Sequence, residues 1–169
     1  VKQIKEVKRG RISEYVETRK KAKYVAKHTD ICTTPCQIAL PCATQNELDE
    51  AAAKTLVKNG VFAVGAGANV PTTLAATRVF LEAGVLFAPG KAANAGGVAT
   101  SALEMAQSSQ RMFWSFEEVD KKLHEIMVNI FKNISSAAAE YDQPKNLILG
   151  ANAAGFKKLS EAMLAHGIC

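Results

Sequence analysis

Short apolar runs alternate with longer amphipathic stretches through the first half of the chain. Apolar runs of about four residues that are bounded by turn residues are typical of buried strands, and the stretches between them are typical of helices. Proline and glycine at the ends of the runs mark where each strand or helix stops. We therefore expect strands at residues 37–40, 61–64 and 85–88, and a further short strand at 23–25.

Capping residues mark the ends of the two helices between these strands. Thr44 and Glu47 have the spacing of a capping box, which predicts a helix that begins there and ends at Asn59-Gly60. A second helix is expected from residues 72–73 to 83, closed by Gly84. Each expected helix thus lies between two expected strands.

The rest of the chain has helical periodicity. From about Val98 onward no strand pattern appears, and Ser115 and Glu118 form a second capping box. The expected helices are residues 1–16 with a break near Gly10, 98–114, 115–141 and 151–165.

Strands that alternate with helices indicate βαβ units and a parallel sheet covered by helices. The sequence therefore predicts one α/β domain. Residues 1–93 are expected to form a Rossmann-like partial parallel sheet with flanking helices, and residues 94–169 an all-helical C-terminal segment. Ligands of such sheets bind outside the carboxyl ends of the strands, where the loops after Leu40, Val64 and Phe87 should converge.

The loop after the last strand is rich in small residues, reading PGKAANAGGVATS from Pro89. Small residues let a backbone approach a ligand closely, and the first N–H groups of a helix favour anionic groups. Asn94 and Ser101 are the polar side chains that could orient such a ligand. Lys91 could also bind an anion, but we do not count it among the site residues. A simple packing loop remains the alternative to a binding site.

The chain lacks the glycine-rich turn that binds a pyrophosphate. No G-x-G-x-x-G follows an expected strand, and the closest string, at residues 65–67, lacks the third glycine. That turn would lie before Val1. Because no methionine precedes Val1, we expect an excised domain that corresponds to the distal half of a dinucleotide-binding domain.

Composition excludes several classes of protein. Of the 169 residues, 48% are hydrophobic, but no apolar run approaches the length of a membrane span. The net charge of +5 comes from residues 1–27, which hold ten Lys or Arg and three Asp or Glu. Apolar residues are interleaved with these charges as on a solvated helix, so we expect neither nucleic acid nor membrane as a partner.

Cysteine spacing suggests a metal site only weakly. His28, Cys32, Cys36 and Cys42 have the pattern H-x3-C-x3-C-x5-C. Structural zinc sites use tighter cysteine pairs, and Cys42 closes an expected strand that would hold it apart from the others. Buried reduced thiols in a cytoplasmic protein are the favoured interpretation, so no metal is expected.

Three motifs resemble one enzyme family. Residues 40–48 read LPCATQNEL, residues 67–73 read GANVPTT and residues 91–105 read KAANAGGVATSALEM. In this order they resemble the C-terminal part of hexameric, NADP-type glutamate dehydrogenases, and the resemblance covers nearly the whole chain. The departures are Ala66, where an acidic residue is common, and Gln37, where aspartate is usual.

The resemblance implies a set of cofactor contacts. Asn69 would contact the nicotinamide ribose, Ala43 and Thr44 would line the adenosine side with main chain, and Asn94 would lie near the nicotinamide end. Other interpretations remain open: Asn69 as a turn residue, Thr44 as a helix cap that also lines the site, and Asn94 as a loop-ordering side chain. The cofactor is expected to be NADP, with NAD possible.

The resemblance also implies the substrate contacts. Val98, through packing, and Ser101, through its hydroxyl, would receive the side-chain carboxylate of glutamate. Alternatively, Ser101 is only a small residue within a helix. The implied reaction is the reversible oxidative deamination of L-glutamate to 2-oxoglutarate and ammonium.

The resemblance places the catalytic lysine and aspartate in an N-terminal substrate domain that is absent here. We therefore expect no catalytic residue in this chain and no activity from it alone. The parent would be a cytoplasmic homohexamer, and the fragment a monomer or weak dimer. A branched-chain or aromatic amino-acid dehydrogenase and a non-catalytic nucleotide-binding module remain alternatives, although Ser101 suits a second carboxylate better than an apolar side chain.

Overall fold

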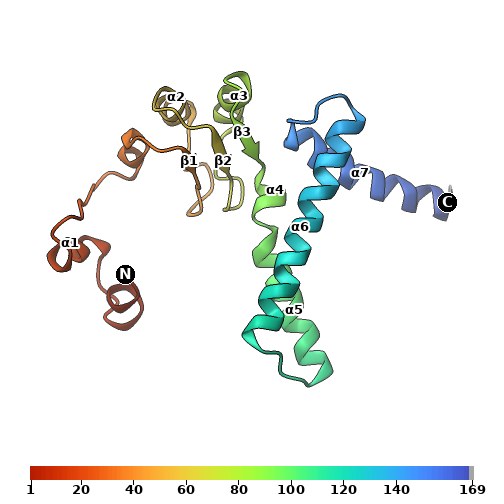
Figure 1. Ribbon diagram of the computed structural model, residues 1–169, viewed down its shortest axis with the longest axis horizontal. Coiled ribbons are helices and arrows are strands. Elements are labelled where there is room, and N and C mark those ends of the chain that lie inside the picture. Colours follow the sequence, from red (N-terminus) through yellow and green to blue (C-terminus); the bar gives the residue numbers. More distant parts are fainter. Residues whose placement is uncertain (168–169) are drawn as a thin grey trace.

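The computed structural model describes residues 1–167 and contains a small parallel sheet. Its strands are β1 (Ile38–Ala39), β2 (Ala63–Gly65) and β3 (Leu86–Ala88), hydrogen-bonded in that order. The three strands expected in these regions are confirmed as parallel, and each is shorter than its apolar run. Their carboxyl ends lie at one edge of the sheet (Figure 1).

Two helices cover one face of this sheet. Helix α2 (Glu50–Lys58) connects β1 to β2, and α3 (Leu74–Glu82) connects β2 to β3. Gly60 and Gly84 follow these helices with φ of 90° and 70°, a conformation that glycine adopts without steric cost. Thr73 caps α3, since its side chain accepts a hydrogen bond from the N–H of Ala76, 3.2 Å away. The end of α2 and both ends of α3 are as expected.

The main core lies between the sheet and these helices. Phe80 of α3 is fully buried, and its ring stacks on that of Phe87 in β3 with centroids 5.9 Å apart. Val64 in the central strand and Leu56 of α2 belong to the same buried cluster. Burial of these apolar side chains fixes both helices on one face and so sets the course of the loops that leave the strands.

The N-terminal segment differs from the expectation in part. A π-helical turn at Gln3–Val7 and short helices at Ile12–Glu14 and Tyr15–Thr18 replace one long helix, and the expected break near Gly10 is confirmed. The strand expected at 23–25 is wrong, because this segment is irregular and pairs with no strand in the described part of the chain. In Figure 1 the first eighteen residues lie away from the sheet.

After β3 the described chain is helical. Its elements are α4 (Gly90–Ala93), α5 (Ala95–Gln110), α6 (Phe116–Glu140) and α7 (Leu147–His166). Helices α5 and α6 form a hairpin that projects from the sheet, and α7 crosses α6 near its other end (Figure 1). The α/β class with a helical C-terminal part is thus confirmed. No helix within residues 1–167 is long and apolar enough to cross a membrane.

Several helix ends differ from the sequence expectation. The Ser115–Glu118 capping box is confirmed, with the Ser115 N–H donating to Glu118 Oε2 at 2.7 Å. The helix before it ends at Gln110 rather than near residue 114, because Arg111 is left-handed with φ of 55°. Helix α7 begins four residues earlier than expected, because the Asn146 side chain caps it by accepting from the N–H of Leu149.

Helices α6 and α7 pack at very close range around a second, smaller core. Ala92 of α4, Ile134 of α6 and Leu147 of α7 are its buried members. Gly150 of α7 lies against the Ile134 carbonyl group, so that any Cβ at this position would overlap the Ile134 oxygen. Glycine is therefore required there for the two helices to approach each other. This small core connects the helical part to α4, and through it to β3.

Candidate functional site at the carboxyl edge of the sheet

Backbone hydrogen bonds join the three loops that follow the strands. The N–H groups of Gly67 and Ala68, after β2, donate to the Pro41 carbonyl, after β1, at 2.9 and 3.2 Å. The N–H of Ala66 donates to the carbonyl of Ala88 at the end of β3, at 3.0 Å. The expected convergence of the loops is confirmed, and the hydrogen bonds show that they form one connected edge.

A second pair of hydrogen bonds holds the β1 and β2 loops together farther from the sheet. The N–H of Asn46 donates to the Val70 carbonyl and that of Leu48 to the Pro71 carbonyl, both at 2.9 Å. Pro71 is fully buried and Leu48 nearly so. The loop that carries Asn69 is therefore hydrogen-bonded to the β1 loop both before and after this residue.

Val70 has an unusual backbone conformation within this loop. Its φ is 50°, in the left-handed region that β-branched residues rarely adopt. The hydrogen bonds from the Asn46 N–H to its own carbonyl and from the Leu48 N–H to the next carbonyl, that of Pro71, hold it there. Strain maintained in this way is common in loops that bind ligands, because it presents the neighbouring residue in one defined position. The neighbour here is Asn69.

Replacing Val70 with asparagine should raise the free energy of unfolding of this chain by about 0.5–1 kcal/mol, because asparagine tolerates the left-handed region better than valine. Urea denaturation measures the change. Val25→Asn is a matched control, since Val25 is also an exposed residue outside helices and strands but has no positive φ. An equal gain in both variants would show that Val70 is not strained.

Asn69 and Asn94 lie in adjacent segments but in different situations. The Asn69 side chain is exposed and makes no hydrogen bond with residues 1–167. The Asn94 amide instead donates to the Ala68 carbonyl at 3.1 Å, so the loop-ordering role considered for Asn94 is observed. This bond places the start of α5 next to the loop that carries Asn69.

The helix expected to begin at Thr44 begins later. Helix α2 starts at Glu50, and the Asp49 side chain caps it by accepting from the N–H of Ala52 at 2.8 Å. The capping role of Thr44 is therefore wrong, and Thr44 lies in an exposed turn with Ala43. The sequence pattern was misleading because aspartate at residue 49 is an equally good cap and lies nearer the apolar residues of α2.

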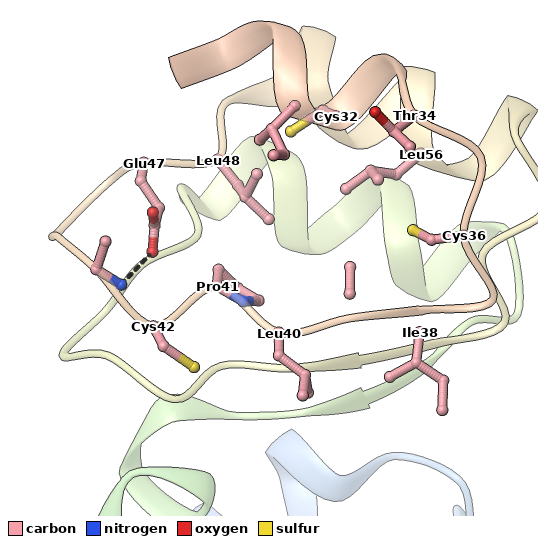
Figure 2. Close-up of a pocket in the computed structure, with 13 residues that line it drawn as sticks. Cys32, Thr34, Cys36, Ile38, Leu40, Pro41, Cys42, Glu47, Leu48 and Leu56 are labelled. Carbon is pink, nitrogen blue, oxygen red and sulfur yellow. Dashed lines mark hydrogen bonds between the residues drawn. The ribbon is translucent and has the colours of Figure 1, made fainter. Parts of the chain in front are cut away.

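Glu47 orders this turn. The sequence had predicted a different role for it, as the second residue of a helix capping box. Its carboxylate accepts a hydrogen bond from the Ala43 N–H at 2.9 Å (Figure 2). The bond closes the 43–47 turn at the end of β1 and fixes the main chain of Ala43. The four-residue spacing between Ala43 and Glu47 was the only signal of this in the sequence.

The small-residue run after β3 is helical rather than a loop. Helix α4 begins at Gly90, and α5 follows from Ala95 with Asn94 between them. Helix α5 thus begins three residues before the expected start near Val98, and the hypothesis that its first N–H groups favour an anion stays a prediction. Gly90 allows a close approach to the β2 loop, since a Cβ there would lie 3.1 Å from the Ala68 carbonyl oxygen.

Val98 and Ser101 lie on one face of α5 with Asn94. Their spacing of four and then three residues places all three side chains on one side of a helix. Val98 is 73% exposed and Ser101 is exposed as well, so this face is open to a ligand. The Ser101 hydroxyl donates to the Gly97 carbonyl at 3.2 Å. Rotation about the Cβ–Oγ bond would redirect this donor to a ligand.

A pocket of about 600 Å³ lies beside β1, between that strand, α2 and the helical turn at His28–Thr33. Figure 2 shows Cys32, Leu48 and Leu56 lining it from the side of the helices, with Ile38 and Leu40 along the strand. The lining is mainly apolar. Sequence reasoning did not identify this pocket, because its residues come together only when the segment before β1 packs on α2.

Cys32, Cys36 and Cys42 form no metal centre with the other described residues. Within residues 1–167, no three His, Cys, Asp or Glu side chains are placed to hold a metal ion. Cys32 is buried, Cys36 half-buried and Cys42 exposed. Burial raises the pKa of the Cys32 thiol, and the nearby carboxylate of Asp49 adds to the effect, so Cys32 is a neutral thiol at physiological pH.

The two departures from the family pattern lie at the ends of strands. Ala66, directly after β2, is fully buried and makes the backbone bond to β3 described above. Gln37, just before β1, is exposed, and its carbonyl accepts from the N–H of Phe62 at 2.9 Å. Both residues thus contribute to the sheet through their backbone groups.

The groups at this edge suit the sugar and amide part of a nucleotide. Asn69 provides an amide and Thr44 a hydroxyl, both exposed, and the ordered main chain at Ala43 adds peptide groups. Such neutral donors and acceptors match ribose hydroxyls and a carboxamide. They provide no cluster of positive charge for phosphates. These groups thus suit the neutral parts of a nucleotide better than its phosphates.

Comparison with known proteins agrees with these features. The chain is 52% identical over 171 residues to the NAD(P)-specific glutamate dehydrogenase of Xylanibacter ruminicola, covering 99% of this chain and 37% of that protein. It is 59% identical over 134 residues to the NADP-specific glutamate dehydrogenase of Escherichia coli K12, covering 79% of this chain and 30% of that protein. The crystal structure of Plasmodium falciparum glutamate dehydrogenase superposes with a TM-score of 0.91 at 46% identity, covering 99% of this chain and 36% of that one.

The chain thus spans about a third of the length of the curated relatives it matches. A model of one dehydrogenase family matches residues 1–167, nearly the whole chain. The match includes all three loops at the carboxyl edge of the sheet and helix α5 beside them. The chain therefore belongs to the glutamate/leucine/phenylalanine/valine dehydrogenase family.

Proposed function

We propose that this chain is part of a longer enzyme that interconverts L-glutamate and 2-oxoglutarate, with release or uptake of ammonium. The cofactor would be NADP, with NAD as the alternative, and when bound it would accept the hydride from the substrate. The observation that carries the proposal is the joining of the three family-like loops to one another and to the start of α5 by hydrogen bonds.

In this proposal the chain is the distal part of a Rossmann-like dinucleotide-binding domain, with α/β units in residues 1–93 and a helical segment that begins at residue 94. An uncovered apolar face of the sheet supports it. Ile38 and Leu40 are 54% and 67% exposed although they belong to an apolar strand run. Their side chains lie on the opposite side of the strand from Leu56 of α2 (Figure 2). Further helices of a longer domain would cover such a face, as in parallel sheets generally.

Four residues would position the cofactor. Asn69, held out by the strained Val70, would bind the nicotinamide ribose, and Ala43 and Thr44 would line the adenosine side. Asn94 would order the nicotinamide end indirectly, through its bond to the Ala68 carbonyl.

Helix α5 would contact the substrate. Val98 would pack on the side chain of glutamate, and Ser101 would turn its hydroxyl from Gly97 to donate to the distal carboxylate. This chain would supply no catalytic residue, because the lysine and the carboxylate that polarise the carbonyl and move protons would belong to a separate substrate domain.

Two other functions have specific consequences. A branched-chain or aromatic amino-acid dehydrogenase needs an apolar pocket, and a hydroxyl at Ser101 would be left unpaired against such a side chain. A non-catalytic nucleotide-binding module would bind the cofactor without oxidising any amino acid. We favour a cytoplasmic homohexamer for the whole enzyme, as the family resemblance implies.

This chain alone should show no glutamate dehydrogenase activity and should bind NADPH only weakly, because it contributes no pyrophosphate turn. Isothermal titration with NADPH and an assay of NADPH formation test both points. Binding at about micromolar Kd would contradict the proposal that the dinucleotide site is incomplete. The full-length enzyme, assayed with glutamate, leucine, valine and phenylalanine, distinguishes the three functions: we expect glutamate to be oxidised fastest.

A further inference from the structure

Helix α5 carries the proposed substrate contacts but has little packing to hold it in place. None of its sixteen residues, all of which the structure describes, is buried. Its close approach to α6 is at Gly96, where a Cβ would lie 3.6 Å from Met127 Sδ. The half-buried side of α5 packs on α6, and its attachment to the sheet depends on the contacts at its start. The contacts of α4, the short helix before it, therefore help to set the direction of α5 relative to the sheet.

Helix α4 is held from two directions. At its end, Asn94 donates to the Ala68 carbonyl in the loop after β2, at 3.1 Å. At its start, the Lys91 ammonium donates to Asn152 Oδ1 of α7, a residue 61 positions away in the chain. Ala92, between them, is buried in the small core of α6 and α7. The sheet edge and the C-terminal helix thus both act on α4.

We propose that Lys91 and Asn152 are positioning residues for the substrate-contacting face of α5, an inference that rests on the function proposed above. Only Asn94 separates α4 from α5, so a rotation of α4 about its axis would carry Val98 and Ser101 with it. The hydrogen bond from Lys91 to Asn152 of α7 would oppose such a rotation. Neither Lys91 nor Asn152 touches the substrate in this arrangement.

The chemistry of the pair fits a positioning role. Lys91 has no carboxylate partner within the described residues, so its donors are directed to a neutral amide oxygen. A charged donor to a neutral acceptor is directional but does not cancel the charge. Another contact of α7 is the ion pair between Lys157 of α7 and Glu140 of α6, at 3.2 Å, which does not involve α4. It provides a matched control.

The test uses the full-length enzyme and two readouts. Lys91→Met and Asn152→Leu should each raise KM for glutamate about three- to tenfold, the range for one exposed hydrogen bond to a charged group, with kcat changed less than about twofold. Hydrogen exchange of residues 95–110 should become faster in both variants. Lys91→Arg, which keeps a donor, should restore both values. Lys157→Met should leave both at the wild-type level.

The outcomes separate this inference from the proposed function. Wild-type KM and exchange in Lys91→Met, with glutamate still oxidised by the wild-type enzyme, would overturn the positioning role alone. Equal changes in Lys91→Met and Lys157→Met would also overturn it, since the effect would then be one of general stability. A wild-type enzyme that does not oxidise glutamate would overturn the proposed function and the substrate role, and the exchange of 95–110 would still decide whether the pair orders α5.

Discussion

Replacing Ser101 with alanine in the full-length enzyme should reduce kcat/KM for glutamate by roughly 10- to 150-fold. The physical reason is that the distal carboxylate would lose one hydrogen-bond donor in a closed site, and a hydrogen bond to a charged group contributes about 1.5–3 kcal/mol. The affinity for NADP(H) should not change, because the contact is made to the substrate. Steady-state kinetics and cofactor titration measure both quantities.

Norvaline separates a substrate contact from a general effect on the helix. It lacks the distal carboxylate, so Ser101→Ala should reduce the preference for glutamate over norvaline. Thr100→Ala is the matched control, since the Thr100 hydroxyl also donates to a carbonyl four residues earlier, that of Gly96, at 2.9 Å. An unchanged glutamate/norvaline ratio in Ser101→Ala would return Ser101 to the role of a small helix residue.

Replacing Gly150 with alanine should lower the free energy of unfolding of this chain by about 1–3 kcal/mol, the usual cost of overpacking. The added Cβ would overlap the carbonyl oxygen of Ile134 and lie 2.9 Å from its carbonyl carbon and 3.0 Å from the Ala138 Cβ. Two of these are backbone atoms, which cannot turn aside as a flexible side chain could. Helices α6 and α7 would have to separate.

Gly155 provides the comparison on the same helix. A Cβ there would meet nothing within 4 Å, so Gly155→Ala should raise the free energy of unfolding by about 0.5–1 kcal/mol through its higher helix propensity. Urea denaturation followed by circular dichroism measures both variants. If Gly150→Ala were as stable as Gly155→Ala, the close crossing of α6 and α7 would be refuted.

Elements governed by local rules were predictable from the sequence. Thr73 caps α3, Gly60 follows α2 and the Ser115–Glu118 box starts α6, because each of these roles depends on neighbours within a few residues. Where two local signals competed, as between Thr44 and Asp49, the sequence alone could not choose. The strand expected at 23–25 failed because a strand exists only where another strand pairs with it.

In the candidate site, too, some features follow from local sequence and others from tertiary contacts. The residues at the carboxyl edge could be named in advance because parallel strands bring their following loops to one edge. How these residues are used depends on contacts between distant positions: Asn94 bonds to the carbonyl of Ala68, 26 residues away, and Lys91 to Asn152. The spacing of Val98 and Ser101 was evident from the sequence, whereas the bond from Ser101 to Gly97 was not.

The sequence by itself determined the α/β class, the three parallel strands and the edge at which their loops meet, since hydrophobic period, caps and turns act over short stretches of chain. Tertiary structure alone decided the turn closed by Glu47, the strained Val70 and the close contact of Gly150 with α6. Each of these requires a specific approach between backbone or side-chain groups. Such approaches are fixed by packing of the whole fold, which no local pattern encodes.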